Sequence, residues 1–166
     1  MLENRKNRTN DAIIHFGAVT IRMLVFRLNK KGKIFQVNRS ERVTNLGQDV
    51  MDTGLICEDA VARNLEAADE FLKIAKDYDV KHIYAFGTSA LRNAANAEEF
   101  VEMFKKRTGI ELHVITGREE ALYGFLGVSQ CYDGEVMVVN ISDQTTRILY
   151  GKREIDHMAC LNQGAQ

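Results

Sequence analysis

The sequence shows little charge bias and has no long apolar run. Its 22 basic and 23 acidic residues give a formal net charge of −1, which excludes a broad electrostatic attraction to nucleic acid or to acidic membranes. The longest apolar segments, such as residues 136–139, are only as long as a strand, so the sequence predicts neither a signal peptide nor a membrane span. We therefore expect a cytoplasmic protein with no nucleic-acid partner and no membrane partner.

Cysteine is also scarce. The three cysteines, Cys57, Cys131 and Cys160, are odd in number and widely spaced, which favours reduced thiols over a disulfide framework. His157 lies close to Cys160 in the sequence, but one histidine–cysteine pair does not complete a metal site. The cysteines and histidines therefore predict no metal centre.

Proline is absent and no segment has low complexity, so no linker is recognisable between residues 12 and 160. A length of 166 residues fits one domain, and 45% apolar with 27% charged residues argues against disorder. We expect a single domain over residues 12–166. The polar segment before it, residues 1–11, is expected to be disordered or extended.

The first part of the chain predicts an antiparallel meander of three strands. Residues 12–17 form a short, largely apolar run. In residues 21–28 apolar positions alternate with partly apolar neighbours, and residues 33–43 form the returning strand after a turn that contains Gly32. Later strands are expected at residues 82–86, 112–115, 136–141, 145–151 and 154–160.

Helical periodicity is clearest over residues 58–78, where apolar residues recur at three- and four-residue steps. A short helical turn is expected at residues 88–94, and two longer helices at 97–108 and 118–130. The longer two begin with capping-box patterns, Asn96 with Glu99 and Thr116 with Glu119. Helices that separate strands predict an α/β fold, a mixed sheet with flanking helices.

Three segments follow one another along the chain: RVTNLGQDVMDTG at residues 42–54, TSALRNAAN at 88–96 and ITGREEALYGFLGV at 115–128. In this order they resemble the exopolyphosphatase/guanosine pentaphosphate phosphohydrolase (Ppx/GppA) family. The resemblance implies the ribonuclease-H-like fold of the actin-like ATPase superfamily, in its N-terminal domain. It also implies polyphosphate or guanosine penta- or tetraphosphate as ligand, and a second actin-like domain as partner. If that domain is missing, an exposed apolar edge is expected, which makes a homo-oligomer the alternative partner.

The family holds phosphates in two turns that follow strands, each with an aspartate that supports magnesium. The first turn, roughly Asp-x-Gly-Ser-Asn-Ser in the family, reads HFGAVT at residues 15–20 here, so Gly17 and Thr20 are the phosphate-binding residues that the resemblance assigns. His15 replaces the aspartate. Imidazole is a poor ligand for magnesium, and Val19 stiffens the turn.

The second turn, roughly Asp-x-Gly-Gly-Gly-Ser-Thr-Glu in the family, reads NISDQTTR at residues 140–147. Thr145 is assigned to phosphate binding, while Asn140 replaces the aspartate and the glycines are absent. The alternative is a simple hairpin turn that contains Asp143 and joins two strands. Because neither turn keeps its aspartate, we expect no metal cofactor, although the family uses magnesium.

Two further residues match functional positions of the family. Glu120 matches the catalytic base that orients or deprotonates water, and Arg92 matches an arginine suited to bidentate phosphate contact. Each has a structural alternative: an acidic residue favoured in the first helical turn by the dipole, and a surface arginine beside a helix cap.

The altered turns predict a Ppx/GppA phosphatase-like domain with degenerate phosphate-binding loops, weak or inactive as a hydrolase and retained for binding or regulation. Two alternatives stand beside it. One is an active exopolyphosphatase or guanosine pentaphosphate phosphohydrolase, and the other is a protein-interaction module.

Overall fold

The computed structural model describes residues 9–30, 32–141, 146–161 and 163. The chain divides into two compact units, Met1–Ile115 and Thr116–Gln166. The single domain expected over residues 12–166 stays a prediction, because this division into compact units does not test it. Among the described helices, none has the length and apolar character needed to cross a membrane.

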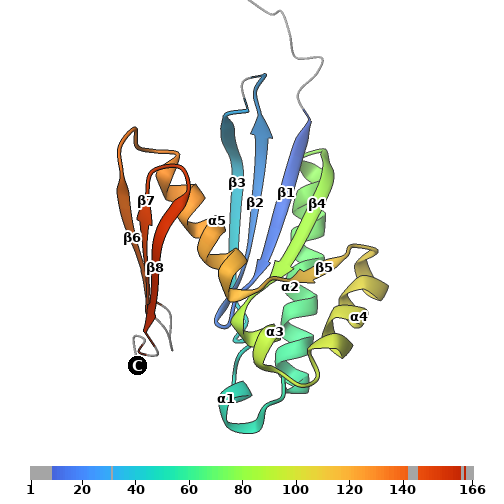
Figure 1. Cartoon of the computed structure of the whole chain (residues 1–166). Helices are drawn as coiled ribbons and strands as arrows, with labels where there is room; N and C mark the ends of the chain where they lie inside the picture. Colours follow the sequence, from blue (N-terminus) through green and yellow to red (C-terminus); the bar gives the residue numbers. More distant parts are fainter. Residues whose placement is uncertain (1–8, 31, 142–145, 162, 164–166) are drawn as a thin grey trace, which may run out of the picture. The chain divides into compact units, whose positions relative to one another are not determined.

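The first unit is built on a five-stranded mixed sheet with the order β3-β2-β1-β4-β5 (Figure 1). β2 runs antiparallel to both β1 and β3, which confirms the predicted meander, and β4 and β5 extend the sheet in parallel. The strands are β1 Asn10–Phe16, β2 Thr20–Leu28, β3 Ile34–Val43, β4 Val80–Gly87 and β5 Leu112–Val114.

Four helices belong to this unit: α1 Val50–Thr53, α2 Glu58–Asp77, α3 Ser89–Asn93 and α4 Ala97–Thr108. The periodic segment predicted as a helix is α2, which ends one residue earlier than expected. The sequence did not predict α1, which is only four residues long. Gly109 follows α4 with φ 73°, the left-handed conformation that ends helices and that glycine adopts without a steric cost.

The core of the first unit lies between β1 and the helices. Alternate residues of β1 are buried, as expected for a strand with one face against helices. Phe16 makes edge-to-face contacts with Phe100 and Phe104 of α4, at ring-centroid distances of 5.5 and 5.2 Å. Such contacts stabilise aromatic pairs beyond their buried area. They hold the end of β1 and the turn that follows it.

The capping box predicted at the start of α4 is wrong. The Asn96 side chain accepts a hydrogen bond from the Ile56 backbone N–H at 2.9 Å and donates to the Ile56 carbonyl at 3.0 Å. It makes no capping bond to α4. A primary amide matches a peptide group in both donor and acceptor, so this distant backbone partner takes the place of the local one.

The second unit contains α5 Gly117–Ser129 and the antiparallel strands β6 Val136–Ile141, β7 Thr146–Gly151 and β8 Ile155–Leu161. Its small core consists of Ala121 and Phe125 of α5 with Leu149 of β7. Ala121 and Phe125, four residues apart, share the face toward the sheet, whereas Leu122 is 37% exposed.

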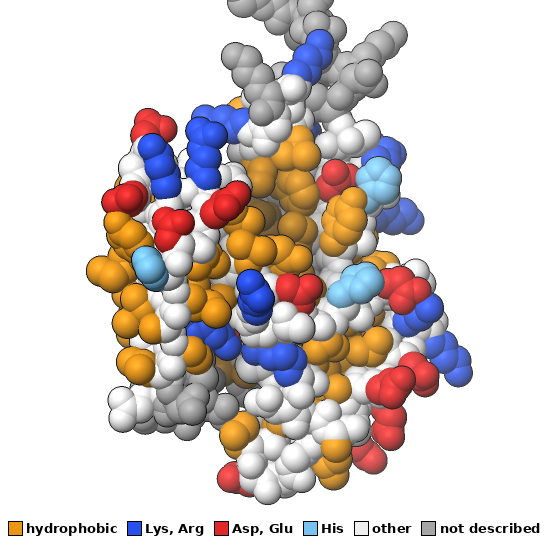
Figure 2. All heavy atoms as spheres, viewed as in Figure 1, with side chains coloured by type: hydrophobic (Ala, Val, Ile, Leu, Met, Phe, Trp, Pro, Cys, Tyr) orange, Lys and Arg blue, Asp and Glu red, His pale blue; other side chains and the backbone are white. Residues whose placement is uncertain are grey.

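The other face of β6 carries exposed apolar side chains. Met137, Val139 and Ile141 are half exposed or more and alternate with Val136 and Val138, which pack on the small core. Figure 2 shows hydrophobic side chains gathered over this three-stranded sheet. The alternation places an apolar row on the side of β6 opposite α5.

Candidate functional site

The turn between β1 and β2 forms the first predicted phosphate loop. The Gly17 N–H donates to the Thr20 carbonyl at 3.0 Å, and a Cβ added to Gly17 would lie 2.9 Å from that same oxygen. Only a residue without a side chain allows this approach. The retained Gly17 therefore defines the shape of the turn.

His15 is packed and hydrogen-bonded at the end of β1. Its ring stacks on Phe86 of the neighbouring β4, with ring centroids 4.8 Å apart and an interplanar angle of 17°. Its Nε2 lies 3.3 Å from Oγ1 of the buried Thr88. His15, which stands where the family pattern has an aspartate, is therefore held in place by Phe86 of β4 and by Thr88.

Thr88 and Arg92 lie beside this turn because β1 and β4 are parallel neighbours whose carboxyl ends meet at one edge. The Thr88 N–H donates to the Phe16 carbonyl at 3.2 Å. One turn further along α3, Nη1 of Arg92 donates to the Ile115 carbonyl at 3.0 Å. The structure thus places the Arg92 segment at the same sheet edge as Gly17.

Glu119 and Glu120 have separate roles in the first turn of α5. Glu119 and Thr116 form the predicted capping box, in which the Thr116 N–H donates to the Glu119 carboxylate at 2.7 Å. Hydrogen bonds from the Thr116 backbone and hydroxyl hold the pKa of Glu119 below its usual value. Glu120 makes an ion pair with Arg147 of β7, at 3.6 Å between Oε2 and Nη1.

The second predicted loop follows β6. Asn140 pairs with Arg147 and Ile141 with Thr146 in an antiparallel register. Asp143 and Thr145 lie outside the described residues, so the phosphate-binding role of Thr145 stays a prediction. The register shows that the loop joins two hydrogen-bonded strands.

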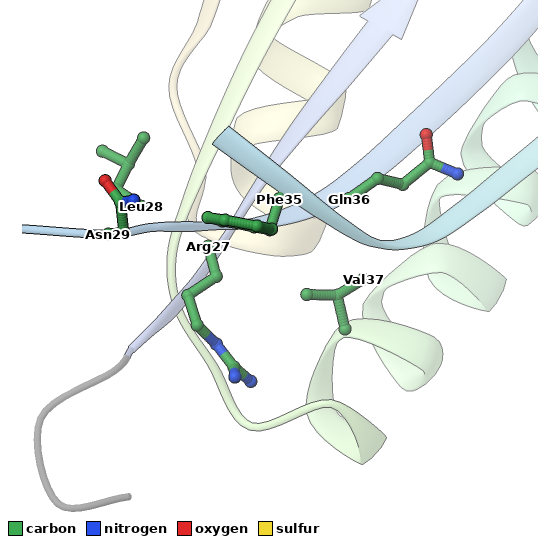
Figure 3. Close-up of a pocket in the computed structure, with 6 residues that line it drawn as sticks. All are labelled: Arg27, Leu28, Asn29, Phe35, Gln36 and Val37. Atoms are coloured by element: carbon green, nitrogen blue, oxygen red, sulfur yellow. The ribbon is translucent and has the colours of Figure 1, made fainter. Parts of the chain in front are cut away.

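A hollow of about 340 Å³ lies at the other end of the β2–β3 hairpin. In Figure 3, Arg27 and Val37 point to one side and Gln36 to the other, with Leu28, Asn29 and Phe35 completing the lining. Nε of Arg27 donates to Asn10 Oδ1 at 2.9 Å. Because β2 begins at Thr20 and ends at Leu28, the hollow lies a full strand length from the Gly17 turn.

Similarity to known proteins covers most of the chain. The model of the Ppx/GppA phosphatase family matches residues 24–165. The chain belongs to the Ppx/GppA phosphatase family. A family member of Aquifex aeolicus with a solved structure is 30% identical, with a TM-score of 0.83 over 95% of this chain and 52% of that one. The likeness confirms the actin-like α/β fold.

Curated relatives of this Ppx/GppA domain include two phosphohydrolases. Exopolyphosphatase 1 of Mycobacterium tuberculosis is 26% identical over 89% of this chain and 44% of its own length. Guanosine-5'-triphosphate,3'-diphosphate pyrophosphatase of Aliivibrio fischeri is 27% identical over 85% of this chain and 29% of its own. The chain therefore spans about half or less of the length of these relatives.

The residues of this Ppx/GppA domain do not fit the magnesium ion that the family resemblance implies. His15 offers an imidazole and Asn140 a neutral amide, whereas magnesium is bound through carboxylates and retained waters. Among the described residues, no three histidine, cysteine, aspartate or glutamate side chains form a group suited to a metal ion.

Sequence reasoning missed Arg147 as the partner of Glu120. The pair joins residues 27 positions apart, and no local pattern links a strand residue to a helix residue at that separation. The available signal was strand alternation, since Arg147 and the apolar Leu149 share one face of β7. That face is the one toward α5.

Proposed function

We propose that this domain binds phosphate chains, as polyphosphate or as guanosine penta- or tetraphosphate, and hydrolyses them weakly or not at all. The observation that carries the proposal is the environment of His15. At the position where the family pattern has an aspartate, an imidazole stacks on Phe86 and bonds Thr88. An imidazole offers magnesium no carboxylate oxygen.

Loss of the metal ligands affects turnover more than loss of a general base would. Phosphoryl transfer depends mainly on positioning and on neutralising charge in the transferred group. A general base contributes about 10²–10⁴-fold. The ion pair of Glu120 with Arg147 supports the same proposal, because the candidate base is already engaged by a cation.

The groups that remain suit phosphate binding. Arg92 is oriented by its bond to the Ile115 carbonyl, and a guanidinium presents several donors in one plane, matched to phosphate oxygens. The Gly17 turn keeps the close backbone approach that a Cβ would prevent. These groups therefore favour a domain that still binds phosphate over one that serves only as a protein-interaction module.

The test is phosphate release from saturating polyphosphate or guanosine pentaphosphate in magnesium buffer. We expect the wild-type chain to release phosphate no faster than a Glu120→Gln variant. Saturation removes any difference in affinity from the comparison. A double variant, His15→Asp with Asn140→Asp, serves as the matched comparison in which the family's carboxylates are restored.

Robust release that requires magnesium and disappears in Glu120→Gln would overturn the proposal in favour of an active phosphohydrolase. Failure of the wild type to bind either phosphate compound would overturn it in the other direction. The binding and turnover assays therefore separate the three functional classes that the sequence leaves open.

A further inference from the structure

The guanidinium of Arg147 lies against the first turn of α5. Arg147 is the second residue of β7, and its side chain shares a face with Leu149, which packs on Phe125 of α5. A Cβ added to Gly117 would lie 3.2 Å from Nη2 of Arg147. The guanidinium therefore lies close to the backbone of Gly117.

Arg147 and Glu120 are both largely removed from solvent. Their side chains are 13% and 25% exposed, and Nη1 and Oε2 lie 3.6 Å apart. A charge in such surroundings needs an opposite charge nearby, because desolvation of an unpaired ion costs several kcal/mol. The distance nevertheless exceeds the ~2.7–2.9 Å of a charge-assisted hydrogen bond, so Glu120 balances the charge of Arg147 without a short bond between these two atoms.

The position of the pair links it to the second phosphate loop. Arg147 occupies the place where the family pattern ends in glutamate, and it stands opposite Asn140, which replaces the loop's aspartate. Two changes thus remove negative charge and add positive charge at one end of the β6–β7 hairpin. An anion is the ligand that such a change favours.

We propose that Arg147 is a phosphate-binding residue and that Glu120 is its internal counter-ion. A phosphoryl oxygen of the bound chain takes the place of the Glu120 carboxylate at the guanidinium, so no divalent cation is needed for this contact. The inference rests on the proposed function and deepens it. It assigns to Arg147 the charge neutralisation that magnesium would otherwise supply.

The exchange predicts opposite effects for the two members of the pair. Glu120→Gln removes the competing carboxylate and is expected to tighten binding of linear polyphosphate roughly two- to tenfold. Arg147→Gln removes charge-assisted bonds and is expected to weaken it roughly ten- to a hundredfold. Arg147→Lys keeps the charge but loses the planar donors, so its affinity is expected between those of Arg147→Gln and the wild type.

Titration calorimetry with linear polyphosphate in EDTA measures these affinities. Arg118→Gln is the matched control, because it removes one positive charge from an exposed side chain of the same helical turn, and about twofold weakening at most is expected. Arg147→Gln removes the guanidinium that pairs with Glu120 and can lose its fold for that reason. The double variant Glu120→Gln/Arg147→Gln removes both charges and is then expected to fold and to bind as weakly as predicted for Arg147→Gln.

Weaker binding in Glu120→Gln, or unchanged binding in the folded double variant, would overturn the role of Arg147. Polyphosphate binding by the wild type would in that case still support the proposed function. Absence of binding by the wild type would overturn both. The two failures are therefore distinguishable in one titration series.

Discussion

Gly87, the last residue of β4, marks a tight contact beneath the segment that carries Arg92. A Cβ added there would lie 2.2 Å from Cδ1 and 3.3 Å from Cγ of Leu91. Leu91 is 2% exposed, and close-packed interiors offer little free volume for a displaced side chain. We expect Gly87→Ala to force Leu91 into another rotamer or to move α3 away from the end of β4.

The expected magnitude combines two opposing contributions. Extra methyl groups in a packed core destabilise by about 1–3 kcal/mol. Alanine in place of glycine within a strand stabilises by about 0.5–1 kcal/mol. Taking the middle of each range, about 2 and about 0.75 kcal/mol, the net loss of unfolding free energy is about 1 kcal/mol, and at about 2–4 °C per kcal/mol the Tm falls by about 2–4 °C.

Scanning calorimetry and urea unfolding measure this change. Gly124→Ala in α5 is the matched control, because its Cβ would meet no atom within 4 Å. Alanine is favoured over glycine within a helix by about 0.8–1 kcal/mol, so this variant should not lose stability. In a double-mutant cycle, Leu91→Ala should relieve the clash, so Gly87→Ala should cost at least ~0.5 kcal/mol less in that background. A Gly87→Ala protein as stable as the wild type, or strict additivity in the cycle, would refute the reasoning.

Two further predictions concern Glu119 at the start of α5 and Gly17 in the turn after β1. The pKa of Glu119 is lower in the folded state, so its contribution to stability is fully present above the pKa of the unfolded state, about 4.3, and is lost as pH falls through the lower folded pKa. Acid unfolding should therefore depend less on pH in Glu119→Gln than in the wild type. Equal pH profiles of the two proteins would refute this prediction. Gly17→Ala should weaken polyphosphate binding in calorimetry, because its Cβ would lie 2.9 Å from the Thr20 carbonyl and force the turn open; unchanged affinity would exclude the turn from the site.

The sequence predicted the long elements because their signals are local. The apolar period of α2 and the Thr116–Glu119 capping box of α5 each lie within a few residues of chain, and both are present in the structure. The four-residue α1 has too few residues to show a period. Its absence from the prediction follows from its length.

The errors and omissions concern contacts between distant residues. Asn96 has the side chain of a helix cap, yet it bonds the Ile56 backbone 40 residues away. The partner of Glu120 became apparent only when the register of β7 placed Arg147 on the face toward α5. A residue type indicates which bonds a side chain can make, whereas the fold decides which partner is within reach.

The most direct test of the account is the affinity of the wild-type chain for linear polyphosphate, measured by titration calorimetry in magnesium buffer and again in EDTA. The account predicts binding in EDTA at least as tight as in magnesium buffer, because His15 and Asn140 supply no carboxylate to a metal and Arg147 supplies the positive charge, while magnesium in solution only neutralises part of the polyphosphate charge. Binding that appears only with magnesium, and is abolished by EDTA, would contradict it.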